Sequence, residues 1–482
     1  MLKYMNTAVR SLHTARQILP RTIKSVLEDQ SSSDAQVFVN GWIRSVRSQK
    51  QVSFANVNDG SNLKGIQAIL TTEQAKALTT GASVQLKGKL VASPGQEQQR
   101  ELQVEHVQVL GECDSTYPLQ KKRHTLEFLR EIGHLRSRGN TGSAVLRLRN
   151  AAVLGFQKFF EQAECFNVHT PIITSHDCEG GGEVFKVLPA SDYETQKAAP
   201  TAMASSEFFK KPVYLTVSGQ LHAEILATSL SRVYTLGPVF RAEESQTSRH
   251  LAEFWMMEAE LAFINDLNQL LDFTEDCIVS TTKYVLDNAR EELEFFNRWT
   301  DKTLLERLEK TVNKPFIRMT YTEAIEVLQG AQQSGKIKFE FPVTWGSSLQ
   351  SEHERYLATT HFQHPVFVTN YPSGLKPFYM RVDETSESSK STVGCFDLLI
   401  PSIGELIGGS MREERYDVLR EKMIESKMDL DEYKWYLDLR RYGTVPHGGF
   451  GLGLERYMLW ITGLESVRDV VPMPRYVGSC RY

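Results

Sequence analysis

The stretch FRAEESQTSRHLAEFWMMEAE, residues 240–260, decides how this sequence is interpreted. It continues the apolar run VYTLGPVF and places Arg241, Arg249 and His250 among acidic and aromatic residues. A solvated surface loop would account for the charges. Arginines that border an apolar strand also suit a bound phosphate, because guanidinium groups hold phosphate oxygens through paired hydrogen bonds. The segments around this stretch must decide between the two interpretations.

Composition sets broad limits on the protein. The 482 residues are 41% hydrophobic and 24% charged, which is ordinary for a globular protein and enough chain for two or three domains. The formal net charge of −4 means that any RNA contact must use local patches. The six cysteines show no CxxC spacing, which argues against a zinc site or redox dithiol. No apolar run approaches about 18 residues, so we expect no membrane span.

The first 27 residues, MLKYMNTAVRSLHTARQILPRTIKSVL, are basic and contain no acidic residue before Glu28. Their apolar residues recur at roughly helical spacing. This composition is typical of a mitochondrial transit peptide, which would send the protein to the mitochondrial matrix. A basic RNA-binding arm or a disordered tail are the alternatives.

Residues 36–112 contain five short apolar runs separated by turn signals such as NDGSN, which predicts a small Greek-key barrel of the OB type. Such barrels bind single-stranded nucleic acid through aromatic stacking and basic side chains. The candidates for that role are Arg44, Arg47, Phe54 and Gln67, although Phe54 fits the barrel core equally well. We expect residues 113–140 to form a linker.

The pattern becomes mixed over residues 141–482. A long amphipathic helix comes first, apolar strands follow, and a mainly helical insertion covers about residues 266–330. Strands joined by hairpins and long helical insertions predict an antiparallel sheet flanked by helices, which is an α+β domain.

Polar side chains interrupt four apolar segments of this domain, each of which we expect to be a strand or a strand end. Besides the opening stretch, the segments are SGQLHAE, DLLIPSIGELIGGSMREE and GGFGLGLERYMLW, and they supply Ser218, Gln220 and Glu224, then Asp397, Glu405 and Arg412, then Arg456. Arginines, carboxylates and a loop of glycines together suit a polyphosphate with divalent ions, because carboxylates bind Mg²⁺ and arginines bind phosphate oxygens.

The sequence resembles the class II aminoacyl-tRNA synthetases, in the subgroup of aspartyl, asparaginyl and lysyl enzymes that carry an N-terminal anticodon barrel. TPIIT, FRAEESQTSRHLAEF and GGFGLGLER are similar to the three motifs of that family. The resemblance extends from about residue 36 to 482. It is strongest to the asparaginyl enzymes, through SRHLAEFWMMEAELAF, IGELIGGSMREER and DLRRYGTVPHGGFGLGLER.

The resemblance implies the reaction. ATP would activate L-asparagine to asparaginyl-adenylate and pyrophosphate, and asparagine would then pass to the 3′ end of tRNA(Asn). It also implies a homodimer built around Pro171 in the first motif. An aspartyl-tRNA synthetase and an ATP-dependent enzyme similar to asparagine synthetase remain as alternatives, and the second of these has no use for the barrel.

The resemblance also implies site residues. The catalytic arginines would be Arg241, at the α-phosphate, and Arg456, at the γ-phosphate. The further ATP-binding residues would be Glu243, Arg249, His250, Phe254 and Glu405. Mg²⁺ would be held by Asp397 and Glu405. The amino-acid site would comprise Glu179, Ser218, Gln220, Glu258 and Arg412, and the anticodon contacts include Phe54 and Gln67.

An asparagine side chain needs an acceptor for its NH₂ group and a donor for its carbonyl oxygen, and Glu258 and Arg412 can supply them. Aspartyl enzymes carry Asp at the position of Glu258 and Lys at the position of Ala223. A bound aspartate would therefore place its carboxylate beside Glu258 with no lysine to compensate. This pairing favours asparagine.

Overall fold

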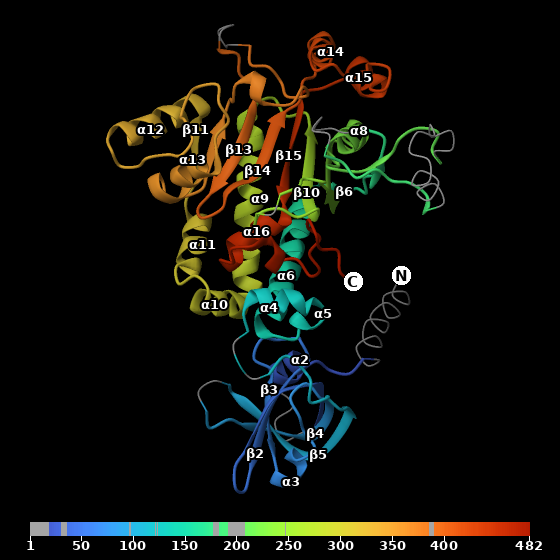
Figure 1. Cartoon of the computed structure of the whole chain (residues 1–482), viewed down its shortest axis with the longest axis vertical. Helices are drawn as coiled ribbons and strands as arrows, with labels where there is room; N and C mark the ends of the chain where they lie inside the picture. Colours follow the sequence, from blue (N-terminus) through green and yellow to red (C-terminus); the bar gives the residue numbers. More distant parts are fainter. Residues whose placement is uncertain are drawn as a thin grey trace, which may run out of the picture. The chain divides into compact units, whose positions relative to one another are not determined.

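The computed structural model describes residues 19–29, 36–95, 98–120, 122, 124–176, 183–190, 208–245, 247–384 and 390–482. The chain divides into two compact units, Met1–Ala144 and Val145–Tyr482 (Figure 1).

The first unit is a closed five-stranded barrel. Its strands are β1 (Gln36–Ser48), β2 (Ser53–Asn58), β3 (Ile66–Leu70), β4 (Ser83–Ala92) and β5 (Arg100–Gly111), joined in the order β1-β2-β3-β5-β4. Strands β3 and β5 run parallel and the other neighbours antiparallel. Alternate residues such as Ile66, Ala68 and Leu70 fill the interior, as the two-residue period of a strand requires. The predicted barrel is confirmed.

A short helix, α2 (Ile23–Glu28), belongs to the barrel unit. Ile23 and Val26 are each 1% exposed and lie in the barrel core. The Ile23 N–H donates to Asp59 Oδ2 at 2.8 Å, and Arg21 pairs with Asp29 at 2.9 Å. The folded unit therefore includes Ile23 and Val26, which fall within the segment 1–27 predicted as a leader. Residues 1–18 of that leader lie outside the described residues.

The segment predicted as a linker, residues 113–140, is partly helical. It contains α4 (Leu126–Glu131) and α5 (Gly133–Arg136), and α6 (Asn140–Gln162) begins at its end. Short α3 (Thr72–Ala75) lies within the barrel sequence, between β3 and β4.

The second unit is built on an eight-stranded sheet. In chain order the strands are β6 (Phe166–Asn167), β9 (Arg232–Phe240), β10 (Glu253–Ala262), β11 (Ile317–Thr320), β12 (Val366–Thr369), β13 (Cys395–Ile400), β14 (Gly404–Met411) and β15 (His447–Gly453). They lie in the order β11-β12-β13-β14-β15-β10-β9-β6. The central strands pair antiparallel, as predicted, but both edge pairs, β11-β12 and β6-β9, are parallel, because helical crossovers connect them. A separate pair joins β7 (Ile173–Thr174) and β8 (Tyr214–Leu215).

Helices flank this sheet. They are α8 (Gln220–Leu230), α9 (Leu267–Asn288), α10 (Arg290–Trp299), α11 (Leu304–Asn313), α12 (Tyr321–Gln333), α13 (Ser351–Arg355), α14 (Tyr416–Glu425), α15 (Lys434–Arg441) and α16 (Leu454–Thr462). The segment predicted as a helical insertion corresponds to α9–α12, interrupted by β11. Figure 1 shows α14 and α15 together at one end of the sheet.

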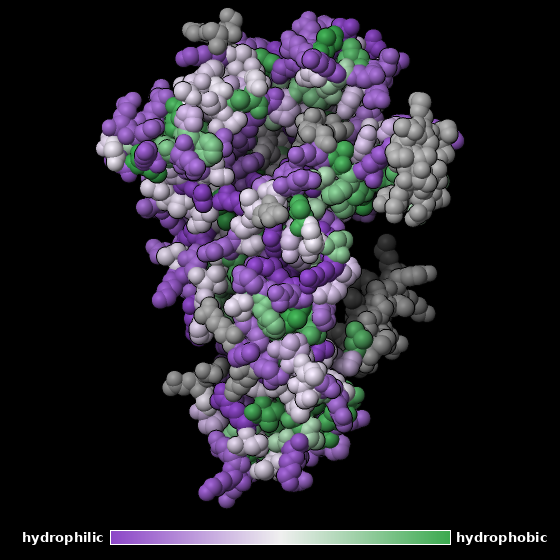
Figure 2. Space-filling view, viewed as in Figure 1, coloured by the Kyte–Doolittle hydropathy of each residue, from purple (hydrophilic) through white to green (hydrophobic). Residues whose placement is uncertain are grey.

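Amphipathic spacing explains α9. Asp266 caps its N-terminus by accepting the Gln269 N–H, and the helix buries Leu270, Thr274 and Ile278 along one stripe. None of the described helices is long and apolar enough to cross a membrane. The face drawn in Figure 2 is mostly hydrophilic, with hydrophobic side chains in scattered groups.

Candidate active site

Strand β10 forms the floor of the site. Because side chains alternate along a strand, Phe254, Met256, Glu258 and Glu260 project from one face. Across the pairing with β15, Glu258 lies opposite Gly451 and Glu260 opposite Gly449.

The glycine run GGFGLG, which was predicted to lie at a strand-to-helix junction and was counted as a loop of glycines, forms strand β15. A Cβ on Gly449 would lie 2.1 Å from Oε2 of Glu260, so glycine leaves the space that this carboxylate occupies. The absence of a side chain at Gly449 therefore serves the packing of an acidic residue. Arg456 follows in the first turn of α16, at the predicted strand-to-helix junction.

The segment SGQLHAE was predicted to lie on a strand, but Gln220 begins helix α8. Leu221, Glu224 and Ala227 are buried at three-residue spacing, which is the helical period. The apolar run is too short to tell the two-residue period of a strand from the helical period. The helix directs Glu224 into the interior.

One cavity, of about 260 Å³, is lined by every residue that was predicted to bind ATP: Arg241, Glu243, Arg249, His250, Phe254, Glu405 and Arg456. The guanidinium carbon of Arg241 lies 5.5 Å from the ring centre of Phe254, and His250 Nε2 lies 3.3 Å from Glu243 Oε2. Segments that are far apart in the sequence therefore meet around one space.

Positive charge accumulates beside this cavity. Partial burial and the nearby guanidinium groups of Arg355 and Arg456 lower the pKa of Arg249. Arg355, on α13, was not predicted from the sequence, because its segment carries no recognisable motif. Like charges repel, so the cluster is most favourable when an anion lies among them.

A second cavity, also of about 260 Å³, adjoins the first, and Arg241, Met256, Glu405 and Gly451 line both. Its lining includes the predicted metal ligand Asp397 and four residues that were predicted to bind the amino acid: Ser218, Gln220, Glu258 and Arg412. Glu179, the remaining predicted residue of this group, lies outside the described residues.

Glu258 and Arg412 have different partners in this cavity. Glu258 accepts a hydrogen bond from the Ser218 hydroxyl and one from the Gly219 N–H at 2.8 Å. Burial raises the pKa of Glu258, although these hydrogen bonds oppose the rise.

Arg412 is held by Glu260. Its Nε donates to Glu260 Oε1 at 3.1 Å, its Nη2 to Glu260 Oε2 at 3.0 Å and its Nη1 to Ser410 Oγ at 2.8 Å. Glu260 was not predicted as a site residue. The two-residue period of β10, which gives Glu260 the same face as Glu258, was the available signal.

The two predicted metal ligands are also paired with cations. Both oxygens of Asp397 lie 2.9 Å from Lys376 Nζ, and Glu405 Oε2 lies 3.2 Å from Arg456 Nη1. Burial raises the pKa of Asp397 against the influence of Lys376. Partial burial also opposes the charge of Glu405, but Arg456 and Lys376 outweigh it and lower the pKa of that carboxyl. Lys376 was missed in the sequence.

These carboxylates fit a cation that completes its coordination with substrate. A Cβ on Gly408 would lie 3.4 Å from Glu405 Oε1 and 3.7 Å from Asp397 Oδ1, so both groups face one point. No group of three or more His, Cys, Asp or Glu residues that could hold a metal occurs within the described part of the chain. Mg²⁺ fits such a set, because it binds one or two carboxylates together with phosphates and water.

Three of the four residues predicted to contact the anticodon, Arg47, Phe54 and Gln67, lie on adjacent strands of the barrel. Phe54 lies between buried Ser53 and Ala55, so its ring projects from the outer face rather than into the core. Arg47 pairs with Phe54 across β1-β2, and Gln67 pairs with Asn56 across β2-β3.

The fourth predicted anticodon residue, Arg44, lies where the register of β1-β2 shifts, between Ile43 and Ser45. Gln67 Nε2 donates to Glu101 Oε1 at 2.9 Å. The geometry thus gathers Arg47, Phe54 and Gln67 on adjacent strands.

Comparison with known proteins gives the family. Residues 126–477 match the tRNA synthetases class II (D, K and N), and residues 37–110 match the OB-fold nucleic acid binding domain. A probable mitochondrial asparagine–tRNA ligase of Dictyostelium discoideum is 48% identical, over 93% of this chain and 94% of its own length. An asparagine–tRNA ligase of Microcystis aeruginosa is 51% identical, over 92% of this chain and 95% of its own length.

Among solved structures, asparaginyl-tRNA synthetase from Pyrococcus horikoshii complexed with asparaginyl-adenylate has a TM-score of 0.82 at 31% identity and covers 96% of this chain and 99% of that one. The two domain matches, the coverage of more than nine-tenths of the chain by the relatives, and the shared fold all indicate the same family. The chain belongs to the asparaginyl-tRNA synthetase family of class II tRNA synthetases.

Proposed function

We propose that this chain activates L-asparagine with ATP and transfers it to the 3′ end of tRNA(Asn) for mitochondrial translation. The observation that carries the proposal is the junction of the two cavities, whose shared wall includes Arg241 and Glu405. A triphosphate beside the cation cluster and an amino acid beside Glu258 would meet at this wall.

In the first step the asparagine α-carboxylate attacks the α-phosphorus of ATP. The new P–O bond forms as the bond to the β-phosphate oxygen breaks, and pyrophosphate leaves. Both reactants are anionic, so Arg241 would neutralise their approach and Arg456 would hold the departing phosphates. The nucleophile is already ionised and needs no general base. In the second step the terminal ribose hydroxyl of tRNA attacks the activated carbonyl, and AMP leaves.

The remaining nucleotide contacts would come from Glu243, Arg249, His250, Phe254 and Glu405, which surround the first cavity. Asp397 and Glu405 would hold Mg²⁺, and the ion, when bound, supplies positive charge for the phosphate oxygens. Lys376 and Arg456 now pair with Asp397 and Glu405, and part of these interactions would pass to the phosphates when ATP binds.

Asparagine would occupy the second cavity, where Ser218, Gln220, Glu258 and Arg412 are the proposed contacts together with Glu179. Glu258 would accept from the amide NH₂ and Arg412 would donate to the amide oxygen. Ala223, which is 1% exposed, carries no charge, so position 223 supplies no cation near Glu258. The carboxylate of a bound aspartate would therefore be repelled by Glu258 without a cation at position 223 to offset the repulsion.

A homodimer and a mitochondrial matrix location complete the proposal. An open groove of about 1130 Å³ runs along α6 and the edge strand β6, with Leu154 and Phe166 exposed by 43% and 56%. Exposed apolar side chains at a sheet edge suit a two-fold contact. The basic first segment and the Dictyostelium relative named as mitochondrial support the location, with the leader ending ahead of Ile23.

Amino-acid-dependent ATP–pyrophosphate exchange tests the activation step. Purified protein is expected to exchange label with asparagine alone, without tRNA, and with a kcat/KM for aspartate that is lower by about 10⁴-fold or more. Exchange driven by aspartate would support an aspartyl-tRNA synthetase instead. Asparagine formed from aspartate and ammonia would support the synthetase-like alternative.

Arg456→Ala is expected to lower the kcat of asparagine-dependent exchange by about 100-fold or more, because it removes a cation proposed to act on the phosphates. Arg290→Ala is the matched control, since Arg290 pairs with Glu294 and Glu309 on the surface of the same unit. Equal activity of the two variants would remove Arg456 from the catalytic set.

Phe54→Ala is expected to lower kcat/KM for tRNA by about tenfold or more, because a base that stacks on an aromatic ring gains about 1–3 kcal/mol. Exchange without tRNA should be unchanged. Phe38→Ala is the control, because Phe38 is an exposed ring beside Lys87 on the β1-β4 side of the barrel. If the two variants impair aminoacylation equally, the anticodon surface has been placed wrongly.

A further inference from the structure

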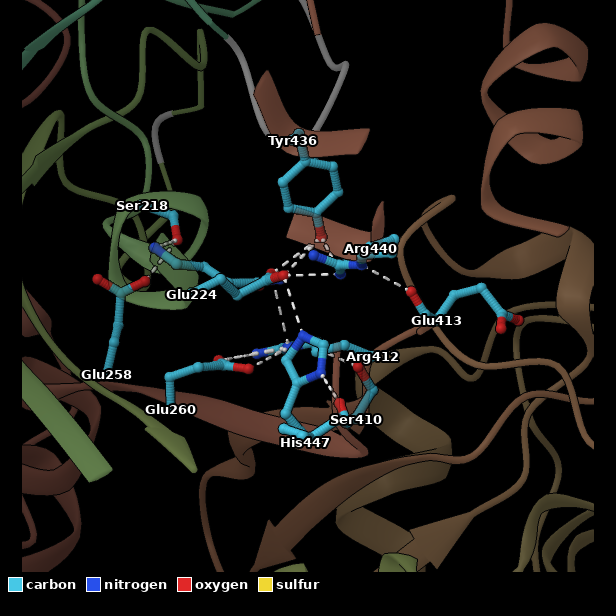
Figure 3. A network of polar contacts seen from close by, with 12 residues as sticks. Ser218, Glu224, Glu258, Glu260, Ser410, Arg412, Glu413, Tyr436, Arg440 and His447 are labelled. Carbon is cyan, nitrogen blue, oxygen red and sulfur yellow. Dashed lines mark hydrogen bonds and ion pairs between the residues drawn. The ribbon is translucent and has the colours of Figure 1, made fainter. Parts of the chain in front are cut away.

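A buried network connects α15 to the wall of the amino-acid cavity (Figure 3). At its centre is Glu224, whose side chain is fully buried. The Tyr436 hydroxyl donates to Glu224 at 2.8 Å and Arg440 Nη2 donates at 2.8 Å, and both donors lie on α15. A carboxylate that is removed from water requires such partners to remain ionised.

The same carboxylate contacts two residues that line the cavity. Gln220 Nε2 donates to Glu224 Oε1 at 3.1 Å, and Arg412 Nε lies 3.9 Å from that oxygen. His447 Nε2 lies 3.4 Å from Glu224 Oε2. In Figure 3, Tyr436 and Arg440 approach Glu224 from one side, and Arg412 and His447 lie on the other. Glu224 is therefore a link between α15 and the proposed asparagine contacts.

Charge within the network is balanced. Arg412 pairs with Glu260 and, more distantly, with Glu224, while Arg440 pairs with Glu224. Burial opposes ionisation of Glu224, but Arg440, His447 and Arg412 outweigh it and lower the pKa of this carboxyl. Two carboxylates thus face two guanidinium groups, and Arg412 carries little uncompensated positive charge toward the cavity.

This balance affects how the cavity distinguishes its ligands. A compensated guanidinium can still donate a hydrogen bond to a neutral amide oxygen, but it attracts a carboxylate less than an uncompensated one would. Loss of the Glu224 charge would leave Arg412 and Arg440 with Glu260 as their remaining carboxylate in the network, and an anionic ligand would then be favoured.

We propose that Glu224, held by Tyr436 and Arg440 of α15, is a positioning residue that sets the orientation and charge compensation of Arg412 and so helps to exclude aspartate. The proposal rests on the asparagine-activating function proposed above and deepens it. No residue of helix α15 lines the cavity, so the effect of this helix on specificity would pass through Glu224.

The test compares Glu224→Gln and Tyr436→Phe with wild type in ATP–pyrophosphate exchange, with asparagine and aspartate varied separately. In E224Q the KM for asparagine should rise, and the ratio of kcat/KM for aspartate to that for asparagine should rise by about tenfold. The KM for ATP should stay within about twofold of wild type. Y436F keeps the ring and should change the ratio in the same direction by a smaller factor.

Glu292→Gln is the matched control. Glu292 is also buried and pairs with Arg147 at 2.7 Å, but it lies on α10 outside the proposed site. E292Q should lower Tm without changing the aspartate-to-asparagine ratio. If E224Q lowers Tm but its aspartate-to-asparagine ratio of kcat/KM equals that of E292Q, Glu224 is merely structural and the proposal is overturned.

If E224Q does not fold, Y436F decides, and an unchanged ratio in folded Y436F overturns the proposal. If wild-type protein shows no asparagine-dependent exchange, the proposed function itself fails, whereas normal wild-type exchange with unaltered variants rejects the positioning role alone.

Discussion

Mutual neutralisation of charges on one face of the central strands is the constraint on which the site depends. Glu260 and Arg412, Asp397 and Lys376, and Glu405 and Arg456 form three such pairs. Leaving a fully buried charge such as that of Glu260 unpaired would cost several kcal/mol, whereas Glu405 and Arg456, which are 39% and 41% exposed, gain less from their pair. The antiparallel part of the sheet sets β13, β14, β15 and β10 side by side and so brings Asp397, Glu405 and Glu260 near one another. Lys376 and Arg456 come from outside these strands. When substrates bind, these charged side chains would exchange part of their present pairing for contacts with the phosphates, the metal ion and the amino acid.

The packing of β15 makes this arrangement possible. Gly449 gives its space to the Glu260 carboxylate, and on the neighbouring strand β14 a Cβ on Gly409 would lie 2.5 Å from the ring of Phe396. Glycine normally weakens a strand, because it lacks a side chain to pack. Here the neighbouring strands supply the side chains, and the glycines leave room for the charged floor. Stability of the sheet and chemistry of the site therefore use the same positions.

Much of this arrangement could be predicted from local sequence. The strand period and turn signals gave the barrel, and the motif residues Arg241, Glu405 and Arg456 surround one cavity. Lys376 was missed because it lies in no recognised motif and its pairing with Asp397 depends on the fold. Glu224 was noted as a polar residue without a role, and Glu260 shares the strand period of Glu258. The partners that define these two carboxylates, Arg440 and Arg412, lie far away in the chain. The helical period of SGQLHAE was too short to recognise, and burial of Ile23 in the barrel core depends on packing that composition does not encode. Tertiary pairing decides these features.

We propose that the two adjoining cavities form a single site for asparaginyl-adenylate. Calorimetric titration of the purified chain with the non-hydrolysable sulfamoyl analogues of asparaginyl-adenylate and aspartyl-adenylate tests it most directly. The asparaginyl analogue is expected to bind far more tightly than asparagine or ATP alone, because it would occupy both cavities at once. The aspartyl analogue is expected to bind much more weakly. Equal affinity for the two analogues would show that the amino-acid cavity does not select asparagine, and an asparaginyl analogue that binds no more tightly than ATP would show that the two cavities are not one site.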